Sequence, residues 1–306
     1  MRNDFVKQVK KEMEKNEDIF FLTADLGFNA LEQIRDTFPD RFINVGIAEA
    51  NMIGVASGLA LTGKTVIAYS IASFLSMRAF EQIRVDACYH NLNVKLFGAG
   101  GGFNYAPHGV THHTIEDLAI MRALPNMKIF NPAYSWEATE VTHATLTCDG
   151  PTYTRLGKAP ATDFSKTGWK FEIGRAYEVK NGKNIVILST GNILDVAMRT
   201  AKILEKSLRK TVSVLSIPSV KPLDNKLILE KAKSAEALFT MEEHSIHGGL
   251  GGAVAELLSQ ANATPETFKI FGFPDRFVKD VGNRDYLLNK VNLSSDTLAE
   301  TIKKLI

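Results

Sequence analysis

Three histidines lie close together in the segment Pro-His-Gly-Val-Thr-His-His, which ends at His113. They follow the stretch Gly-Ala-Gly-Gly-Gly at 98–102, which comes directly after an apolar run. Imidazole groups titrate near neutral pH, so His108 and His112 could transfer protons or hydrogen-bond a substrate. A metal site would need a further carboxylate or cysteine, and no spacing in the chain specifies one. A structural role is the remaining alternative.

A single carboxylate, that of Glu49, stands near the start of an apolar run of small residues over 46–61. If this residue is buried, its carboxyl group could share a proton with a ring nitrogen of a bound ligand. The alternative is a partly exposed residue that is favoured at a helix N-terminus by the helix dipole. The residues alone leave both interpretations open.

Three further candidates lie at or shortly after the ends of predicted strands. Arg155 lies near the end of the run 152–156, where ligands bind in parallel sheets, and could hold a phosphate or a carboxylate. Tyr69 and Phe74 flank the segment 70–73, and either ring could stack on a heterocycle. The alternatives are a surface salt bridge for the arginine and core packing for the two aromatic rings.

Short apolar runs alternate with longer segments of helical period, a pattern that predicts parallel sheets covered by helices. We therefore expect the α/β class, with two α/β domains that are each built on a parallel or mixed sheet. The first domain would span 1–157, a linker rich in Pro, Ser, Thr and Gly would span 158–174, and the second domain would span 175–306. The expected strands are 19–23, 65–70, 94–97, 128–131 and 152–156, then 185–190, 212–217, 237–242 and 268–272.

Composition excludes several classes of protein. The 306 residues include 36 Lys+Arg and 34 Asp+Glu, and a net charge of +2 gives no electrostatic case for nucleic acid or an anionic membrane surface. Cys88 and Cys148 are the two cysteines, too few for a disulfide framework. No apolar run reaches the roughly 18 residues of a membrane span, and the charged first segment lacks the features of a signal peptide. We expect a soluble cytoplasmic protein.

Several longer motifs, taken in order, resemble the carboxyl-terminal half of transketolase in the form found as a separate subunit. The resemblance covers essentially the whole chain, and similar halves occur in 1-deoxyxylulose-5-phosphate synthase and in the beta subunits of oxo-acid dehydrogenases. The motifs are Thr-Ala-Asp-Leu (23–26), Phe-Pro-Asp-Arg-Phe-Ile-Asn-Val-Gly-Ile-Ala-Glu-Ala-Asn-Met (38–52), Arg-Ala-Phe-Glu-Gln-Ile-Arg (78–84), Thr-His-His-Thr-Ile-Glu-Asp-Leu-Ala (111–119), Met-Arg-Ala-Leu-Pro-Asn-Met (121–127), Lys-Pro-Leu-Asp (221–224) and Glu-Glu-His-Ser-Ile-His-Gly-Gly-Leu-Gly (242–251).

The resemblance implies a pyrimidine-binding domain followed by a transketolase carboxyl-terminal domain, with thiamine diphosphate as cofactor. This half would hold the aminopyrimidine ring. The diphosphate and its Mg²⁺ or Ca²⁺ would be held by an amino-terminal half through a Gly-Asp-Gly motif, which this chain lacks. We therefore expect no metal site in this chain. We expect instead a separate amino-terminal-half partner subunit, in an α2β2-like assembly with homodimeric contacts.

The resemblance also implies which residues would hold the cofactor. Glu49 would hydrogen-bond the ring nitrogen of the aminopyrimidine and help the cofactor to lose its thiazolium C2 proton. Phe74 would stack on the pyrimidine, with Tyr69 as the alternative. Asp25 would lie near the cofactor and the subunit contact.

On the substrate side, the resemblance implies that His112 faces the oxygen atoms of a sugar or sugar phosphate and that Arg155 binds the phosphate. Three positions depart from the family pattern. His108 stands where the family has an acidic residue that contacts a donor hydroxyl. Gly100 stands where many members have a histidine, and Asn29 replaces a phosphate-binding serine. These changes put the usual substrates in question.

We therefore expect a transketolase-like transferase that is active only with its partner half. It would transfer a two-carbon ketol unit from a ketose or ketose phosphate to an aldose. One alternative is the beta-type subunit of another thiamine diphosphate enzyme, similar to 1-deoxyxylulose-5-phosphate synthase or to an oxo-acid dehydrogenase. Another is a non-catalytic assembly protein of the same fold, because a fold does not fix its chemistry.

Overall fold

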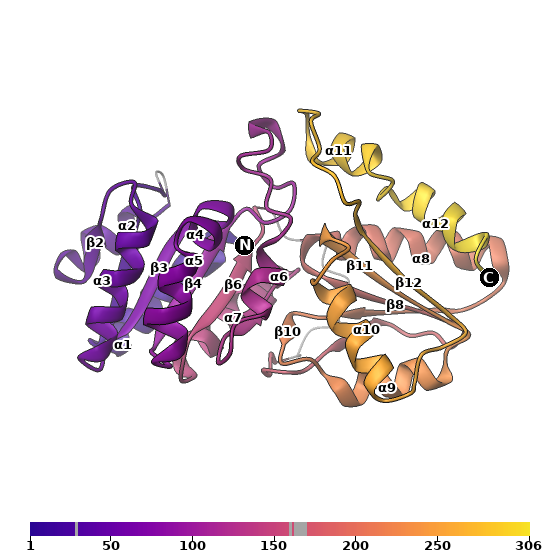
Figure 1. Cartoon of the computed structure of the whole chain (residues 1–306), viewed down its shortest axis with the longest axis horizontal. Helices are drawn as coiled ribbons and strands as arrows, with labels where there is room; N and C mark the ends of the chain where they lie inside the picture. Colours follow the sequence, from indigo (N-terminus) through magenta and orange to yellow (C-terminus); the bar gives the residue numbers. More distant parts are fainter. Residues whose placement is uncertain (28–29, 159–160, 162–169) are drawn as a thin grey trace.

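The computed structural model describes residues 1–27, 30–158, 161 and 170–306. In this part of the chain two sheets form, each between layers of helices (Figure 1). The first sheet has the strand order β10 (Ser219–Lys221), β5 (Lys128–Phe130), β6 (Thr152–Leu156), β4 (Val94–Ala99), β3 (Thr65–Ile71), β1 (Ile19–Thr23) and β2 (Phe42–Asn44). The second has the order β12 (Thr267–Phe273), β11 (Ala237–Ser245), β8 (Ile185–Thr190), β9 (Val212–Ser216) and β7 (Tyr177–Lys180).

The first sheet is parallel from β5 to β2, and its central strands are buried almost throughout. Such strands are near-continuous apolar runs because helices cover both faces of the sheet. At one edge, β10 pairs antiparallel with β5, so a strand from the second half of the chain completes the first sheet. The second sheet also carries an antiparallel edge, where β7 pairs with β9. The predicted α/β class is confirmed, and both sheets are mixed.

Two helical layers cover the first sheet. On one face, Phe5 and Val9 of α1 (Arg2–Lys15) pack with Phe97 of β4. On the other face, Met52 and Ile53 of α3 (Glu49–Leu61) pack with neighbouring strand residues. The remaining helical elements of this half are α2 (Glu32–Thr37), η1 (Pro39–Arg41), α4 (Ala72–Arg78), α5 (Phe80–Gln82), η2 (Ile83–Tyr89), η3 (Ala106–His108), α6 (Asp117–Arg122) and α7 (Ser135–Thr147).

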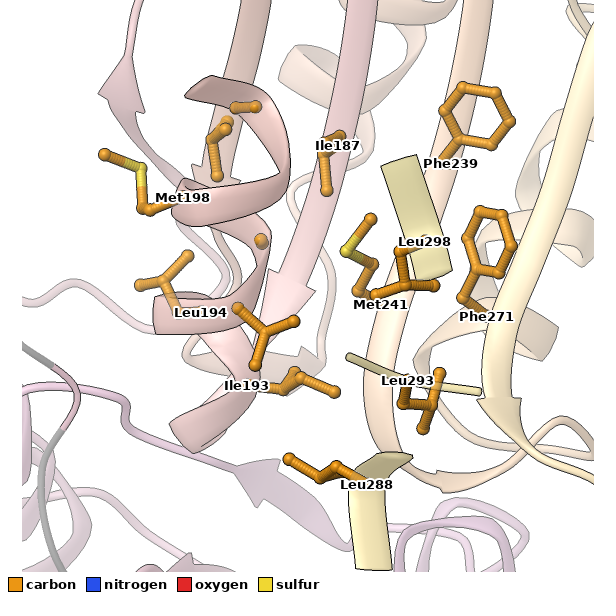
Figure 2. Close-up of a cluster of buried hydrophobic side chains, with 14 of the residues drawn as sticks. Ile187, Ile193, Leu194, Met198, Phe239, Met241, Phe271, Leu288, Leu293 and Leu298 are labelled. Atoms are coloured by element: carbon orange, nitrogen blue, oxygen red, sulfur yellow. The ribbon is translucent and has the colours of Figure 1, made fainter. Parts of the chain in front are cut away.

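The second sheet shows the alternation expected of strands, in which successive side chains point to opposite faces. Ile187 and Phe239 point to the core beneath α8 (Leu194–Leu208) and α12 (Ser295–Lys303), as Figure 2 shows. Their neighbours Leu188 and Leu238 point to the core beneath the helices of the other face. These are α9 (Asn225–Ser234) and α10 (Leu250–Gln260); η4 (Gly191–Ile193) leads into α8, and α11 (Arg284–Lys290) precedes α12.

The predicted linker over 158–174 falls largely outside the described residues, at 159–160 and 162–169. The two halves nevertheless contact one another directly. The backbone N–H of Ser245 donates to the carbonyl of Ile115 at 2.7 Å, and Arg122 forms two hydrogen bonds with Glu256 at 2.6 and 2.8 Å. Within the described residues, no helix has the length and apolar character that crossing a bilayer requires.

Candidate functional site

Glu49 begins α3 and is 3% exposed. Gly46, at φ +74°, forms the turn that leads from β2 into this helix. The Glu49 carboxylate accepts a hydrogen bond from Ser70 Oγ of β3 at 3.1 Å and one from Arg78 Nη1 of α4 at 3.1 Å. The structure therefore supports the first interpretation of Glu49, that of a buried carboxylate, and not that of a partly exposed residue.

The ring of Phe74 is half-buried and lies against Arg78, the arginine that also bonds Glu49. Arg78 connects the two groups, because its guanidinium lies 4.0 Å from the centroid of the Phe74 ring while it also bonds Glu49. The arginine side chain is 49% exposed. A ring that stacks on Phe74 and bonds Glu49 would have to replace a contact of Arg78. The sequence motif that contains Arg78 carried part of the family resemblance, but the motif alone gave this residue no role.

Two of the three clustered histidines lie side by side in the loop that follows β4, and one of them contacts Phe74. The His112 ring meets the Phe74 ring edge-on at 5.0 Å, and His108 lies 4.9 Å from His112. Tyr105 lies edge-on to both imidazoles. His113, by contrast, is buried, and its Nε2 lies 3.2 Å from the carbonyl oxygen of Ala106. These contacts indicate a structural role for His113.

The surroundings of His112 favour its neutral form. Partial burial lowers its pKa, and the neighbouring His108, His113 and Arg78 lower it further. A neutral imidazole can both donate and accept a hydrogen bond, which suits contacts with the carbonyl and hydroxyl groups of a sugar.

Replacement of His108 by asparagine is expected to raise the pKa of His112, because a protonated His108 disfavours a second positive charge nearby. An NMR titration of the His112 ring protons from mildly acidic to mildly alkaline pH measures this directly. His143→Asn is the control, since His143 bonds Glu12 on α1 and lies on α7. An unchanged His112 titration in the H108N variant would contradict the coupling.

The structure places Arg155, the predicted ligand of a sugar phosphate, in a buried network of polar contacts. Its side chain is 3% exposed, and its Nε lies 3.1 Å from Oδ2 of Asp117. Its Nη2 donates to the backbone carbonyls of Thr114 and Glu243, the latter at 2.9 Å. The guanidinium therefore belongs to a buried ion pair within the first half of the chain and reaches the second half through the carbonyl of Glu243. Arg155 also lines a small pocket with Asn104 and Asn192.

The structure also places Tyr69 away from the Glu49 site. The Tyr69 ring is 1% exposed and stacks on Phe5 of α1 at 5.5 Å. Neighbouring strand residues point to opposite faces, so Ser70 points to Glu49 while Tyr69 points to the α1 side. Tyr69 is therefore a core residue on the α1 side, and this geometry favours Phe74 over Tyr69 for a ring bound at Glu49. Phe74 remains the candidate for stacking on such a ring.

Asp25 is exposed and follows β1 at φ +52°. Its carboxylate accepts a hydrogen bond from Asn44 Nδ2 at 3.0 Å, and its N–H donates to Asn44 Oδ1 at 2.9 Å. Both residues line an open cavity of about 300 Å³. The predicted substrate residue Asn29 lies outside the described residues.

A larger cleft of about 600 Å³ lies at the carboxyl ends of β3, β4 and β6, beside the start of α1. Sequence reasoning missed its cationic residues, although Lys158 stands just past the end of β6, where ligands of parallel sheets bind. Tyr105 connects the cleft to His112, and a side chain at Gly100 would run into the Tyr105 ring. The lining residues are Met1, Arg2, Asn3, Asp4, Lys7, Tyr69, Ala99, Gly100, Tyr105, Leu156, Gly157 and Lys158.

The described side chains thus form a path from Glu49 through Phe74 and His112 to Tyr105 and the cationic cleft. No group of three or more His, Cys, Asp or Glu side chains in the described residues is placed to hold a metal ion.

Comparison with protein families identifies the class to which this fold and site belong. Residues 1–161 match the model of the transketolase pyrimidine binding domain, and residues 174–297 match that of the transketolase C-terminal domain. The chain therefore belongs to the transketolase family, whose members depend on thiamine diphosphate.

Individual relatives are themselves separate subunits. One subunit of the apulose-4-phosphate transketolase of Actinobacillus succinogenes is 34% identical over 86% of this chain and 84% of its own length. The 6-deoxy-6-sulfo-D-fructose transketolase subunit SqwH of a Clostridium species is 34% identical over 96% of this chain and 91% of its own length. A solved structure described as a split gene transketolase, inactive beta4 tetramer, has a TM-score of 0.87 at 35% identity and covers 99% of this chain and 97% of its own.

Glu49 and Phe74 fit the pyrimidine ring of the family's cofactor. A buried carboxylate offers the polar partner that a ring nitrogen requires, and the half-buried Phe74 ring, which shares Arg78 with it, offers a stacking surface.

Proposed function

We propose that this chain is the carboxyl-terminal half of a split, thiamine-diphosphate-dependent transketolase that transfers a two-carbon ketol unit from a ketose to an aldose. The observation that carries the proposal is the continuous path from the buried Glu49 carboxylate to the cationic cleft. The relatives described as transketolase subunits support it.

In this proposal, Glu49 and Phe74 hold the pyrimidine ring, and Glu49 exchanges a proton with its nitrogen. Thiamine diphosphate, when bound, supplies the stabilisation of negative charge on carbon that ketol transfer needs. Ser70 orients the Glu49 carboxylate through its hydrogen bond. His112 hydrogen-bonds the oxygen atoms of the substrate where charge develops.

The partner of the proposed enzyme is an amino-terminal half that holds the diphosphate and Mg²⁺ or Ca²⁺, within an α2β2-like assembly in the cytoplasm. Helix α3 supports such an assembly. Ile47 lies just before this helix and Leu61 is its last residue. Their large apolar side chains are 76% and 67% exposed. Gly54 and Gly58 are exposed, with nothing near the position of an added Cβ. A face of this kind is typical of a protein–protein contact.

We propose that the substrate is a sugar that carries an anionic group, because Arg2, Lys7 and Lys158 line the cleft. The names of the two relatives described above support this, since one refers to a sugar phosphate and the other to a sulfo sugar. Guanidinium and ammonium groups bind phosphate and sulfonate through charge-assisted hydrogen bonds.

Replacement of Lys158 or Arg2 by methionine is expected to raise the KM for an anionic sugar about 10–100-fold, the worth of one charge-assisted hydrogen bond. Steady-state kinetics of the assembled enzyme with phosphorylated and unphosphorylated sugars measure the effect, which should vanish for the neutral sugar. Lys11→Met is the matched control, because Lys11 is an exposed lysine of α1 outside the cleft. An unchanged KM in both K158M and R2M would exclude this cleft as the anion site.

The test of the whole proposal is to purify the chain with a candidate amino-terminal half. Thiamine diphosphate and Mg²⁺ binding is then measured for each half and for the mixture, followed by transfer assays on a panel of sugars. Tight cofactor binding and ketol transfer only in the mixture are expected. Cofactor binding without transfer to any aldose would favour the non-catalytic alternative, and release of carbon dioxide from a 2-oxo acid would favour the other thiamine diphosphate enzymes.

A further inference from the structure

The loop that carries His108 and His112 is closed at its base by a short antiparallel bridge. The N–H of Gly102 donates to the carbonyl of Thr114 at 2.8 Å, and the N–H of Thr114 donates to the carbonyl of Gly102 at 3.1 Å. Beyond this bridge His108 is exposed and His112 is half-buried. The direction in which His112 points therefore depends on how the base of the loop is held.

A carboxylate from the second sheet reaches this base. Glu243 of β11 is 4% exposed, and its Oε2 accepts a hydrogen bond from the backbone N–H of Phe103 at 3.1 Å. Its Oε1 accepts a hydrogen bond from Arg284 Nε at 2.6 Å. Gly102 makes this approach possible, because a Cβ at that position would run into the Glu243 carboxylate.

Other residues of the second half of the chain also contact the base of this loop. The Phe103 ring packs against Phe273 of β12 at 4.3 Å. The N–H of Ser245 donates to the carbonyl of Ile115, just past the base of the loop, at 2.7 Å. The loop of the first half is therefore supported at its base by residues of the second half (Figure 1).

We propose that Glu243 is a positioning residue, through which the second domain holds the loop so that His112 faces the substrate. Glu243 acts through the Phe103 N–H and is itself buried, with both oxygens occupied by Phe103 and Arg284. The effect on ketol transfer rests on the proposed function, whereas the effect on loop order does not.

Hydrogen exchange of the whole chain tests the loop order. In Glu243→Gln one carboxylate oxygen becomes an NH₂ group, which is a donor and cannot accept a hydrogen bond. The cationic Arg284 holds the remaining oxygen more strongly, so the NH₂ group faces the Phe103 N–H and that bond is lost. Residues 103–114 should therefore exchange about tenfold faster or more. Glu256→Gln is the matched control, because it weakens another contact between the two halves without touching the loop. Unchanged exchange of 103–114 in E243Q, or an equal increase throughout the second domain, would overturn the proposal.

A double-mutant cycle in the assembled enzyme tests the route through His112. E243Q is expected to lower kcat/KM about tenfold in the wild-type background and to have little further effect beside His112→Ala. The dissociation constant of thiamine diphosphate should stay the same. Equal losses in both backgrounds would show that Glu243 does not act through His112. If the wild-type complex transfers no ketol unit, the proposed function fails, while hydrogen exchange still decides whether Glu243 positions the loop.

Discussion

Substitution of Glu49 by glutamine is expected to reduce ketol transfer by the assembled enzyme about 10²–10⁴-fold, the usual contribution of a positioned proton-transfer group. Glutamine has nearly the same shape and can still accept the hydrogen bond from Ser70, but it cannot take up or release a proton at the ring nitrogen. Steady-state kinetics with the partner half and saturating thiamine diphosphate measure the loss.

The comparison needs a control for folding and for assembly. Glu81→Gln changes an exposed glutamate on α5 in the same half of the chain and should keep wild-type turnover. The thermal midpoint of Glu49→Gln should stay near that of the wild type, so that lost activity is not lost structure. Turnover of E49Q within tenfold of wild type would exclude a proton-transfer role for Glu49.

The strands that could be predicted from sequence are those buried on both faces. The runs 19–23, 152–156 and 185–190 coincide with β1, β6 and β8, because a parallel strand between helical layers is buried on both faces and favours apolar and β-branched residues. The sequence pattern did not predict β7 and β10, which are edge strands with antiparallel partners. Edge strands bury less of their surface and carry a weaker apolar signal.

The segment 74–89, whose apolar residues recur with a helical period, is not one continuous α-helix in the structure. It contains the end of α4, the short α5 and the π-helical η2. A π-helix shifts the hydrogen-bond pattern by one residue while it keeps a helix-like period, so hydrophobic periodicity alone cannot reveal the change.

The site was predictable where a residue's role depends on its own neighbours in the sequence. Glu49 within its apolar run and His112 after the glycine stretch are of this kind, and the structure brings both to Phe74. Tyr69 could have been excluded, because the alternation along its strand gives it a different face from Ser70. Lys158 and Arg2 are far apart in sequence, and only the fold shows that they line one cleft.

The surroundings of Arg155 could not be predicted, for a different reason. Its place near the end of a strand was correct, as β6 shows, but the sequence does not reveal that Asp117 lies against it. Asp117 is fully buried, and its Oδ2 accepts a hydrogen bond from Tyr153 Oη at 2.6 Å and contacts Arg155 Nε at 3.1 Å. Burial and the neighbouring Asp117 raise the pKa of Tyr153 well above its ordinary value, so the phenol stays a donor.

Replacement of Arg155 by methionine is therefore expected to lower the free energy of unfolding by about 3–5 kcal/mol, the usual cost of removing one partner from a buried ion pair. Methionine leaves the Asp117 carboxylate buried without its cation, and the carbonyls of Thr114 and Glu243 without their donor. Urea and thermal denaturation of the purified chain measure this change. Arg199→Met removes an exposed pair with Asp195 and should change the stability by less than about 1 kcal/mol.

A second substitution separates the ion pair from substrate binding. Adding Asp117→Asn to Arg155→Met removes the uncompensated charge, so the double variant should be more stable than R155M alone. A phosphate-binding arginine would behave in the opposite way, because its loss would raise the KM for an anionic sugar, leave the unfolding curve unchanged and gain nothing from D117N. Wild-type stability of R155M together with a raised KM would support the prediction made from sequence. A large loss of stability that D117N partly reverses would establish Arg155 as the buried link between the two halves and leave anion binding to the cleft at Lys158.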